Sequence, residues 1–136
     1  MDALDTEIIH QLRRDGRAAY TSIAEMVCAS EATVRTRVRR LVEEGTIRQF
    51  TVRVRGANLR ALIEVAIETN VITSEVASRI RELAGVEEVW ELTGDFDIAA
   101  ICSADGTDEL NELVEGIRAV GSIRSTRTRV ILNEIV

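Results

Sequence analysis

The sequence predicts an α+β fold in two parts, an N-terminal winged helix-turn-helix joined to a C-terminal ferredoxin-like βαββαβ domain. Three stretches with apolar residues at helical spacing occupy the first 45 residues. From residue 61 onward, strand-like and helix-like stretches alternate in the order β-α-β-β-α-β. A cluster of arginines over residues 31–55 lies where the two patterns meet. We therefore expect a first domain at residues 1–55, a linker at 56–60 and a second domain at 61–136.

Start and stop signals place three helices in the first domain. The first lies between Asp2 and Gly16, a helix-capping acid and a helix-ending glycine. Ser22 and Glu25 match a capping box, which predicts that the second helix begins near Ser22. The third follows Ser30, a good N-cap residue, and runs to about residue 44. Residues 47–55 then alternate with β-branched side chains, which predicts a strand or wing.

The second domain contains four expected strands and two expected helices. Thr93, Gly94 and Asp95 form a tight hairpin signal between its second and third strands. The strands are expected at 61–69, 86–92, 96–102 and 123–135, and the helices at 73–84 and 107–119.

Several of these strands are apolar on both faces, as the first strand illustrates with Leu62 and Ala66 opposite Ile63 and Val65. Two helices cover only one face of a four-stranded sheet. We therefore expect a second copy of the chain to bury the other face, giving a homodimer or a higher even oligomer.

Charge is distributed unevenly along the chain. Residues 1–55 carry ten arginines against eight acidic residues, whereas residues 56–136 carry seven against fifteen. Residues 31–55 alone have seven arginines and three glutamates. A basic patch on a chain of net charge −6 indicates one face that binds a polyanion.

The third helix is the candidate recognition helix for double-stranded DNA. About four residues separate it from the second helix, which is the spacing of a helix-turn-helix. Residues near its start are expected to reach base edges, and the later arginines are expected to contact phosphates. A solvated charged helix is the alternative. The candidates opposite the apolar stripe are Thr33, Arg35, Thr36, Arg39 and Arg40.

Other features exclude several classes of protein. No stretch approaches the roughly 18 apolar residues of a membrane span, and the acidic start lacks signal-peptide character, so we expect a cytoplasmic protein. Cys28 and Cys102 lie far apart, and His10 is the single histidine, which argues against disulfides and a zinc site. With no nucleophile motif and no glycine-rich phosphate loop, we expect no catalytic residues, cofactor or metal.

The chain resembles the Lrp/AsnC, or feast/famine, family of transcription regulators. The resemblance rests on residues 4–9, 23–25, 30–34, 37–47 and 93–97, in the family's order and over essentially the whole chain. It implies sequence-specific DNA binding that responds to an amino acid or a related metabolite. The lysine-free, acidic composition further predicts a salt-loving, haloarchaeal host.

The resemblance also implies an effector site in the second domain, between subunits. Gly94 has no Cβ, so a ligand can approach its backbone, and Asp97 can hold a ligand ammonium group. Thr126 and Thr128 on the last strand can supply hydroxyl contacts. On the residues alone, a plain hairpin turn beside a solvated Asp97 is the simpler interpretation.

Three classes of function remain open. The first is a metabolite-responsive DNA-binding regulator. The second is a DNA-binding or architectural protein whose C-terminal domain only oligomerises. The third is a small enzyme on a ferredoxin-like domain, such as an acylphosphatase. That enzyme needs an arginine-bearing anion loop after the first strand, and residues 70–73 supply none.

Overall fold

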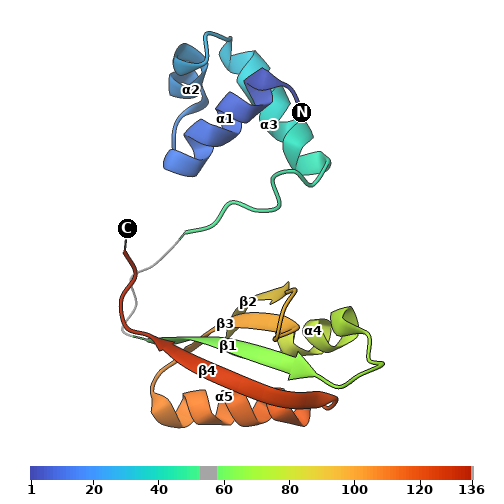
Figure 1. Cartoon of the computed structure of the whole chain (residues 1–136). Helices are drawn as coiled ribbons and strands as arrows, with labels where there is room; N and C mark the ends of the chain where they lie inside the picture. Colours follow the sequence, from blue (N-terminus) through green and yellow to red (C-terminus); the bar gives the residue numbers. More distant parts are fainter. Residues whose placement is uncertain (53–57, 136) are drawn as a thin grey trace. The chain divides into compact units, whose positions relative to one another are not determined.

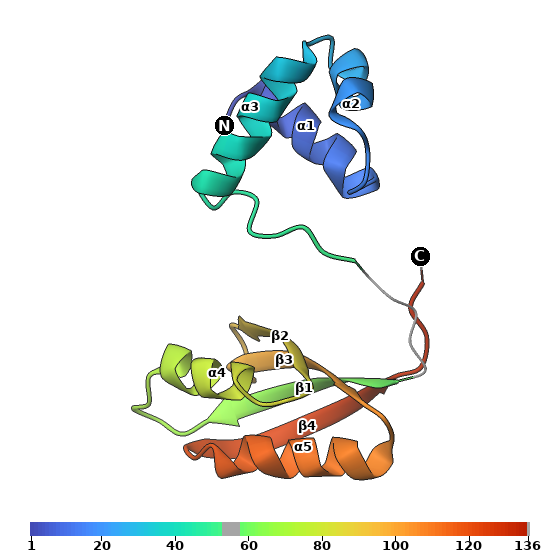
Figure 2. The same ribbon diagram turned by 180° about the vertical axis from the view of Figure 1, so that it is seen from behind.

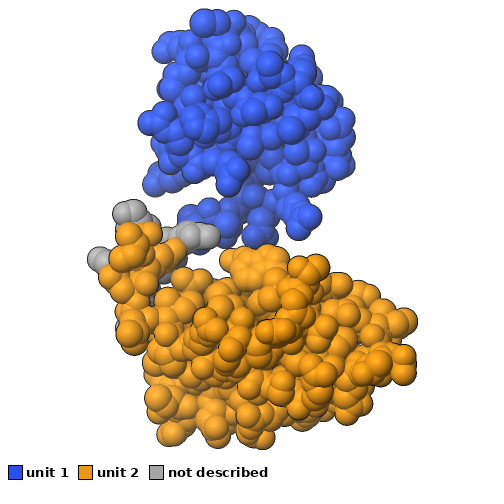
Figure 3. All heavy atoms as spheres, in the orientation of Figure 1, with its two compact units in different colours: residues 1–54 blue, residues 55–136 orange. Residues whose placement is uncertain are grey.

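The chain divides into two units, residues 1–54 and residues 55–136, which Figure 3 distinguishes by colour. The computed structural model describes residues 1–52 and 58–135. Residues 56 and 57 of the expected linker lie outside this part of the chain. Leu59 and Arg60, also assigned to the linker, instead begin the first strand.

Unit 1 contains the helices α1 (Ala3–Arg14), α2 (Tyr20–Met26) and α3 (Glu31–Glu43), shown in Figure 1. Asp2 caps α1 in a reciprocal capping box with Asp5, and Ser30 caps α3 by accepting from the Thr33 amide. The three helices share one apolar core, whose buried members are Ile8, Ile23, Ala24, Val34 and Val38.

The start of α2 differs from the prediction. The helix begins at Tyr20, so Ser22 lies inside its first turn and caps nothing. The Ile23 amide already donates to the Ala19 carbonyl at 3.0 Å. Tyr20 and Ala18 pack against the core of unit 1. Helix α2 therefore begins about half a turn before Ser22, where the capping box had indicated its start, and its first residues pack against the core.

The predicted wing strand is wrong over residues 47–52, which form no strand. Residues 53–55 of this prediction lie outside the described residues. A strand requires a partner for its backbone hydrogen bonds, and the described residues of unit 1 contain only helices. Ile47 packs against the core of unit 1, but Phe50 is 55% exposed and Val52 76% exposed, so the described residues leave these two apolar side chains largely uncovered.

Unit 2 is a four-stranded antiparallel sheet with two helices, in the predicted order β-α-β-β-α-β (Figures 1 and 2). The strand order is β2-β3-β1-β4, so β1 and β3 are central. The fold class is thereby confirmed. The elements are β1 (Leu59–Ile67), α4 (Thr73–Arg81), β2 (Val86–Glu91), β3 (Ile98–Ala104), α5 (Thr107–Ala119) and β4 (Ile123–Ile131).

Both helices pack on one face of this sheet. Alternate residues of β1, including Ile63 and Val65, share a core with Ile80 of α4 and Ile117 of α5. We call the opposite face the open face. It carries Leu62 beside Ile101, the 46% exposed Trp90, and an ion pair between Glu64 and Arg127 at 2.9 Å.

Candidate DNA interface and ligand pocket

Helix α3 turns its apolar side inward and its polar side to solvent. Val34, Val38 and Leu41 are fully or almost fully buried. Of the predicted DNA contacts, Arg35, Thr36 and Arg39 are exposed, and Thr33 and Arg40 are half-buried. Helical spacing therefore leaves the five candidates along one side of the helix, as a recognition helix requires.

The two candidates nearest the start of α3 are held by neighbours. The Thr33 hydroxyl lies 2.8 Å from the Ser30 hydroxyl, within the N-cap. The Arg35 guanidinium forms an ion pair with Glu31 at 2.5 Å and lies over the Tyr20 ring at 5.3 Å. Thr36 and Arg39 make no such contact with described residues.

Arg40 has a second, structural role that sequence reasoning missed. Its guanidinium donates at 2.6 Å to both oxygens of Asp5, a residue of α1 that is completely buried. Arg37 donates to Asp5 at 3.0 Å and also to Asp2. The Arg40 hydrogen bonds, with the Asp2 capping contact, hold the pKa of Asp5 well below its usual range. No local signal predicts these contacts, because more than thirty residues separate the partners in sequence.

The turn before α3 passes through Cys28, whose φ of +54° lies in the left-handed region. Glycine adopts this region most easily, and Cys28 is exposed there rather than packed as a small apolar residue. Cys102, in contrast, is buried in β3, and burial raises the pKa of its thiol to about 11.

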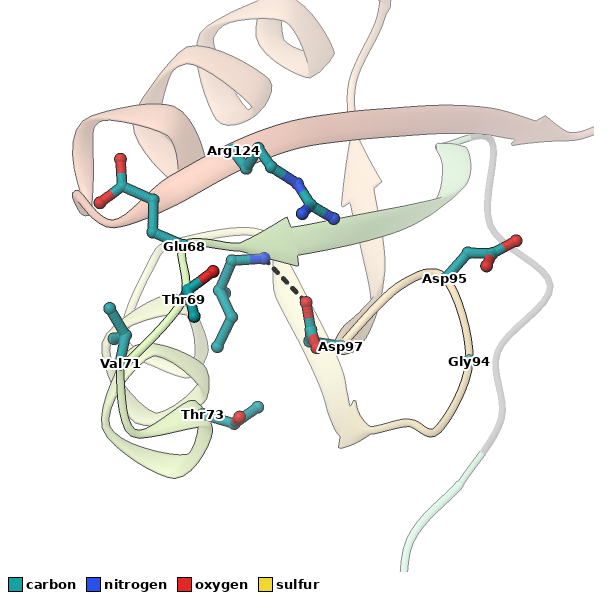
Figure 4. Close-up of a pocket in the computed structure, with 9 residues that line it drawn as sticks. Glu68, Thr69, Val71, Thr73, Gly94, Asp95, Asp97 and Arg124 are labelled. Atoms are coloured by element: carbon teal, nitrogen blue, oxygen red, sulfur yellow. Dashed lines mark hydrogen bonds between the residues drawn. The ribbon is translucent and has the colours of Figure 1, made fainter.

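Unit 2 has a pocket of about 520 Å³ where β1 ends and the loop between β2 and β3 passes. Gly94, at φ +108°, has nothing within 4 Å of the position its Cβ would take. A ligand can therefore approach the backbone closely at Gly94. The lining residues, drawn in Figure 4, are Ile67, Glu68, Thr69, Val71, Thr73, Gly94, Asp95, Asp97 and Arg124.

Asp97 anchors this loop to the end of β1. Its amide donates to the Val65 carbonyl at 2.9 Å, and its Oδ2 accepts from the Ile67 amide at 2.9 Å. Its other carboxylate oxygen has no hydrogen-bond partner among the described residues. In Figure 4 Asp97 points into the pocket, whereas the carboxylates of Glu68 and Asp95 are turned outward.

Arg124 is one of the pocket residues that the sequence analysis did not identify. It extends from β4 across the end of β1 and forms no ion pair with any described residue (Figure 4). Sequence offered one weak signal, an arginine at the start of the last strand. Thr126 and Thr128 do not line this pocket, and their place in an effector site between subunits stays a prediction.

Strand register explains why the threonines lie elsewhere. Thr126 pairs with Val65 and Thr128 with Ile63, further along the sheet than the Ile67 end that forms the pocket. Neither lines the pocket, and the Thr126 hydroxyl lies 3.3 Å from Nε of Arg118 on α5. No group of three or more potential metal ligands occurs in the described residues, and none of their helices is long and apolar enough to cross a membrane.

Comparison with known proteins bears on both sites. Residues 1–42 match the AsnC-type helix-turn-helix domain, and residues 60–136 match the Lrp/AsnC ligand binding domain. The HTH-type transcriptional regulator LysM of Sulfurisphaera tokodaii is 34% identical over 133 residues, covering 97% of this chain and 95% of LysM. E. coli AsnC has the same fold, with a TM-score of 0.78 at 23% identity over 100% of this chain and 95% of AsnC.

A homocitrate synthase of S. tokodaii is 42% identical over 78 residues, which make up 57% of this chain but 17% of the enzyme. This short match does not extend to the rest of that enzyme. The two domain matches and the full-length relative define a class of regulator. The chain belongs to the Lrp/AsnC family. It is a DNA-binding transcription regulator with a ligand-binding domain, and it is not an enzyme.

Proposed function

We propose that this regulator changes its DNA binding when an amino acid occupies the pocket at the end of β1. Asp97 holds the ammonium group of the ligand, and Arg124 holds its carboxylate. One observation carries the proposal: a carboxylate and a guanidinium line the same pocket without forming an ion pair with each other. A zwitterion satisfies both charges at once, whereas a simple anion or cation leaves one unpaired.

On the DNA side, the exposed face of α3 enters the major groove. Thr33, Arg35 and Thr36 read base edges, and Arg39 contacts phosphate. Arg40 adds positive charge to the same face while it remains bound to Asp5. Exposure of Arg35, Thr36 and Arg39 supports these roles.

The active species is a homodimer or a higher even oligomer, joined through the open face of the sheet. This face carries the apolar side chains Leu62, Ile101 and Trp90, and neither described helix of unit 2 covers it. Two recognition helices in a dimer match the two half-sites of a palindromic operator. A DNA-binding regulator works where the chromosome is, which places the protein in the cytoplasm.

A DNA-binding protein whose C-terminal domain only oligomerises is the second candidate. The homocitrate synthase match argues for sensing, because its 78 residues exceed the whole of unit 1 and so include part of unit 2. A related stretch within an enzyme supports a role separable from DNA binding. The expected salt-loving host stays a prediction, and relatives from Sulfurisphaera and Pyrococcus give it no support.

A thermal-shift screen of the full chain against the twenty amino acids tests the proposal. A ligand that binds only the folded protein raises its melting temperature. Calorimetric titration of the best ligand into Asp97→Asn and Arg124→Gln should then show an affinity about tenfold or more lower in each. Asparagine retains an oxygen for the Ile67 amide, which separates loss of charge from loss of the loop anchor. Unchanged ligand affinity in both variants would show that the amino acid does not bind in this pocket.

A further inference from the structure

Arg35 and Arg39 lie one helical turn apart on the exposed side of α3, but their surroundings differ. Arg35 forms a 2.5 Å ion pair with Glu31, one turn earlier on the same helix, and lies 5.3 Å from the centre of the Tyr20 ring on α2. Arg39 is exposed and has no ion pair or ring contact with described residues. The chain thus contains a held arginine and a free arginine on one helix.

We propose that Tyr20 and Glu31 are positioning residues that hold Arg35 ready to read a guanine edge. The proposal rests on the proposed role of α3 in base recognition. It assigns to Tyr20, which belongs to the preceding helix and not to the recognition helix, a part in sequence discrimination. Arg39 remains a flexible phosphate contact.

The contacts leave one part of the Arg35 guanidinium available to DNA. Glu31 binds Nη2 and the guanidinium carbon lies over the Tyr20 ring, whereas Nη1 and Nε have no hydrogen-bond partner among the described residues. The side chain is 55% exposed. A guanine presents two acceptors, O6 and N7, and arginine is well suited to bind both. A free arginine loses considerable rotamer freedom on binding, and a held one loses less.

Glu31 also changes the electrostatics of Arg35. Its carboxylate offsets part of the charge that Arg35 offers to a phosphate, so the pair contributes less than a free arginine to binding that is independent of sequence. A guanine edge rewards the directed donors of Arg35 rather than its net charge. The pair therefore favours specific over random DNA, whereas Arg39 strengthens binding to both.

Glu31→Gln gives the most distinctive expectation. Loss of one negative charge beside the DNA should tighten binding to a random duplex, while the preference for the specific duplex falls. The two effects have opposite signs, and a loss of folding cannot produce the first. Fluorescence anisotropy of the full chain measures both, with a duplex selected from a random pool by the parent protein and a random duplex of equal length.

Tyr20→Leu tests the ring contact, and Tyr20→Phe is its matched control. A cation–π contact at an exposed site corresponds to about a two- to fivefold effect, so Tyr20→Leu should lower the specific-to-random ratio by about that factor. Phenylalanine keeps the ring and should keep the ratio. In an Arg35→Ala background, Tyr20→Leu should have no further effect on the ratio, because Tyr20 acts through Arg35. Melting temperatures of all variants report folding separately.

Three results would overturn the inference: an unchanged ratio in Tyr20→Leu, an equal loss of ratio in the Arg35→Ala background, or weaker random binding in Glu31→Gln. Each of these leaves the proposed function standing if the parent still prefers the selected duplex. A parent without any preference between the two duplexes would contradict sequence-specific binding itself.

Discussion

Asp5 joins the first helix of unit 1 to the recognition helix. Its side chain is buried and accepts hydrogen bonds from Arg37, Arg40 and the Asp2 amide, and the two arginines reach it only when α1 and α3 pack together. A buried carboxylate is stable only when its oxygens are satisfied in this way. Asp5 therefore makes the geometry of α3 depend on α1.

Asp5→Asn should lower the melting temperature of the chain, because the charge-assisted hydrogen bonds to two arginines are lost. The pKa of Asp5 is lowered in the folded state. Its contribution to stability is therefore present above the unfolded pKa of about 3.9 and is lost as the pH falls below that value. Thermal unfolding of parent and variant between pH 7 and pH 3 checks this. The difference between the two melting temperatures should narrow toward pH 3 without closing, because the lowered folded-state pKa keeps the Asp5 carboxylate charged there, and a constant difference would contradict the linkage.

The two adjacent arginines Arg39 and Arg40 should respond differently to alanine substitution. Arg39→Ala should weaken binding to all DNA sequences and reduce the salt slope by about 0.9, with the melting temperature unchanged. Arg40→Ala should weaken binding to all sequences too, but should also lower the melting temperature because Asp5 loses a partner. Salt titrations on random DNA, with thermal unfolding beside them, distinguish the pair. An Arg40→Ala protein with an unchanged melting temperature would show that Arg40 has no structural role.

At the scale of elements, two glycines show how close packing shapes unit 2. A Cβ on Gly85 would lie 2.8 Å from the Ser103 carbonyl oxygen, and its φ is +88°. Gly85→Ala should therefore cost about 2 kcal/mol of unfolding free energy or more. A Cβ on Gly116, inside α5, meets only Leu83 at 3.9 Å. Gly116→Ala should instead stabilise by about 0.5–1 kcal/mol. Denaturant titration of both variants measures these values, and a neutral Gly85→Ala would show that the strand ends can separate freely.

Local signals predicted elements where the cause is local. Ser30 caps α3 as expected, because an N-cap depends on residues three apart. The Ser22 signal misplaced the start of α2, and alternation over residues 47–52 produced no strand, because tertiary packing and strand pairing are not encoded in a short window. Gly94 and Asp97 were found from their loop. Arg124 was not, since it reaches the pocket through the pairing of β4 with β1 and the register shift between Ala66 and Ile67.

At the scale of the whole molecule, we expect copies of the protein to assemble through the open face of the sheet. Trp90→Glu places a charge on this face at a position already 46% exposed, so the single chain should still fold. Sedimentation should show a shift from dimer toward monomer. Ile72→Glu is the matched control, because Ile72 is 59% exposed and lies beside α4 rather than on the open face. An unchanged assembly in Trp90→Glu would place the interface elsewhere.

In the proposed function, one molecule couples the binding of an amino acid in unit 2 to the binding of DNA on unit 1. Coupling between two sites is reciprocal: if the ligand changes DNA affinity by a factor, DNA must change ligand affinity by the same factor. The coupling also requires that the ligand bind two states of the protein with different affinity.

The most direct measurement is a pair of titrations on the full chain, DNA binding with and without the best amino acid from the screen, and amino acid binding with and without DNA. We expect one equal factor in both directions, of about 5- to 150-fold, in the parent protein. Without ligand, Asp97→Asn should bind DNA as the parent does. At the ligand concentration that changes the DNA affinity of the parent, the DNA affinity of Asp97→Asn should stay the same. An amino acid that binds the pocket yet leaves DNA affinity unchanged would contradict this coupling.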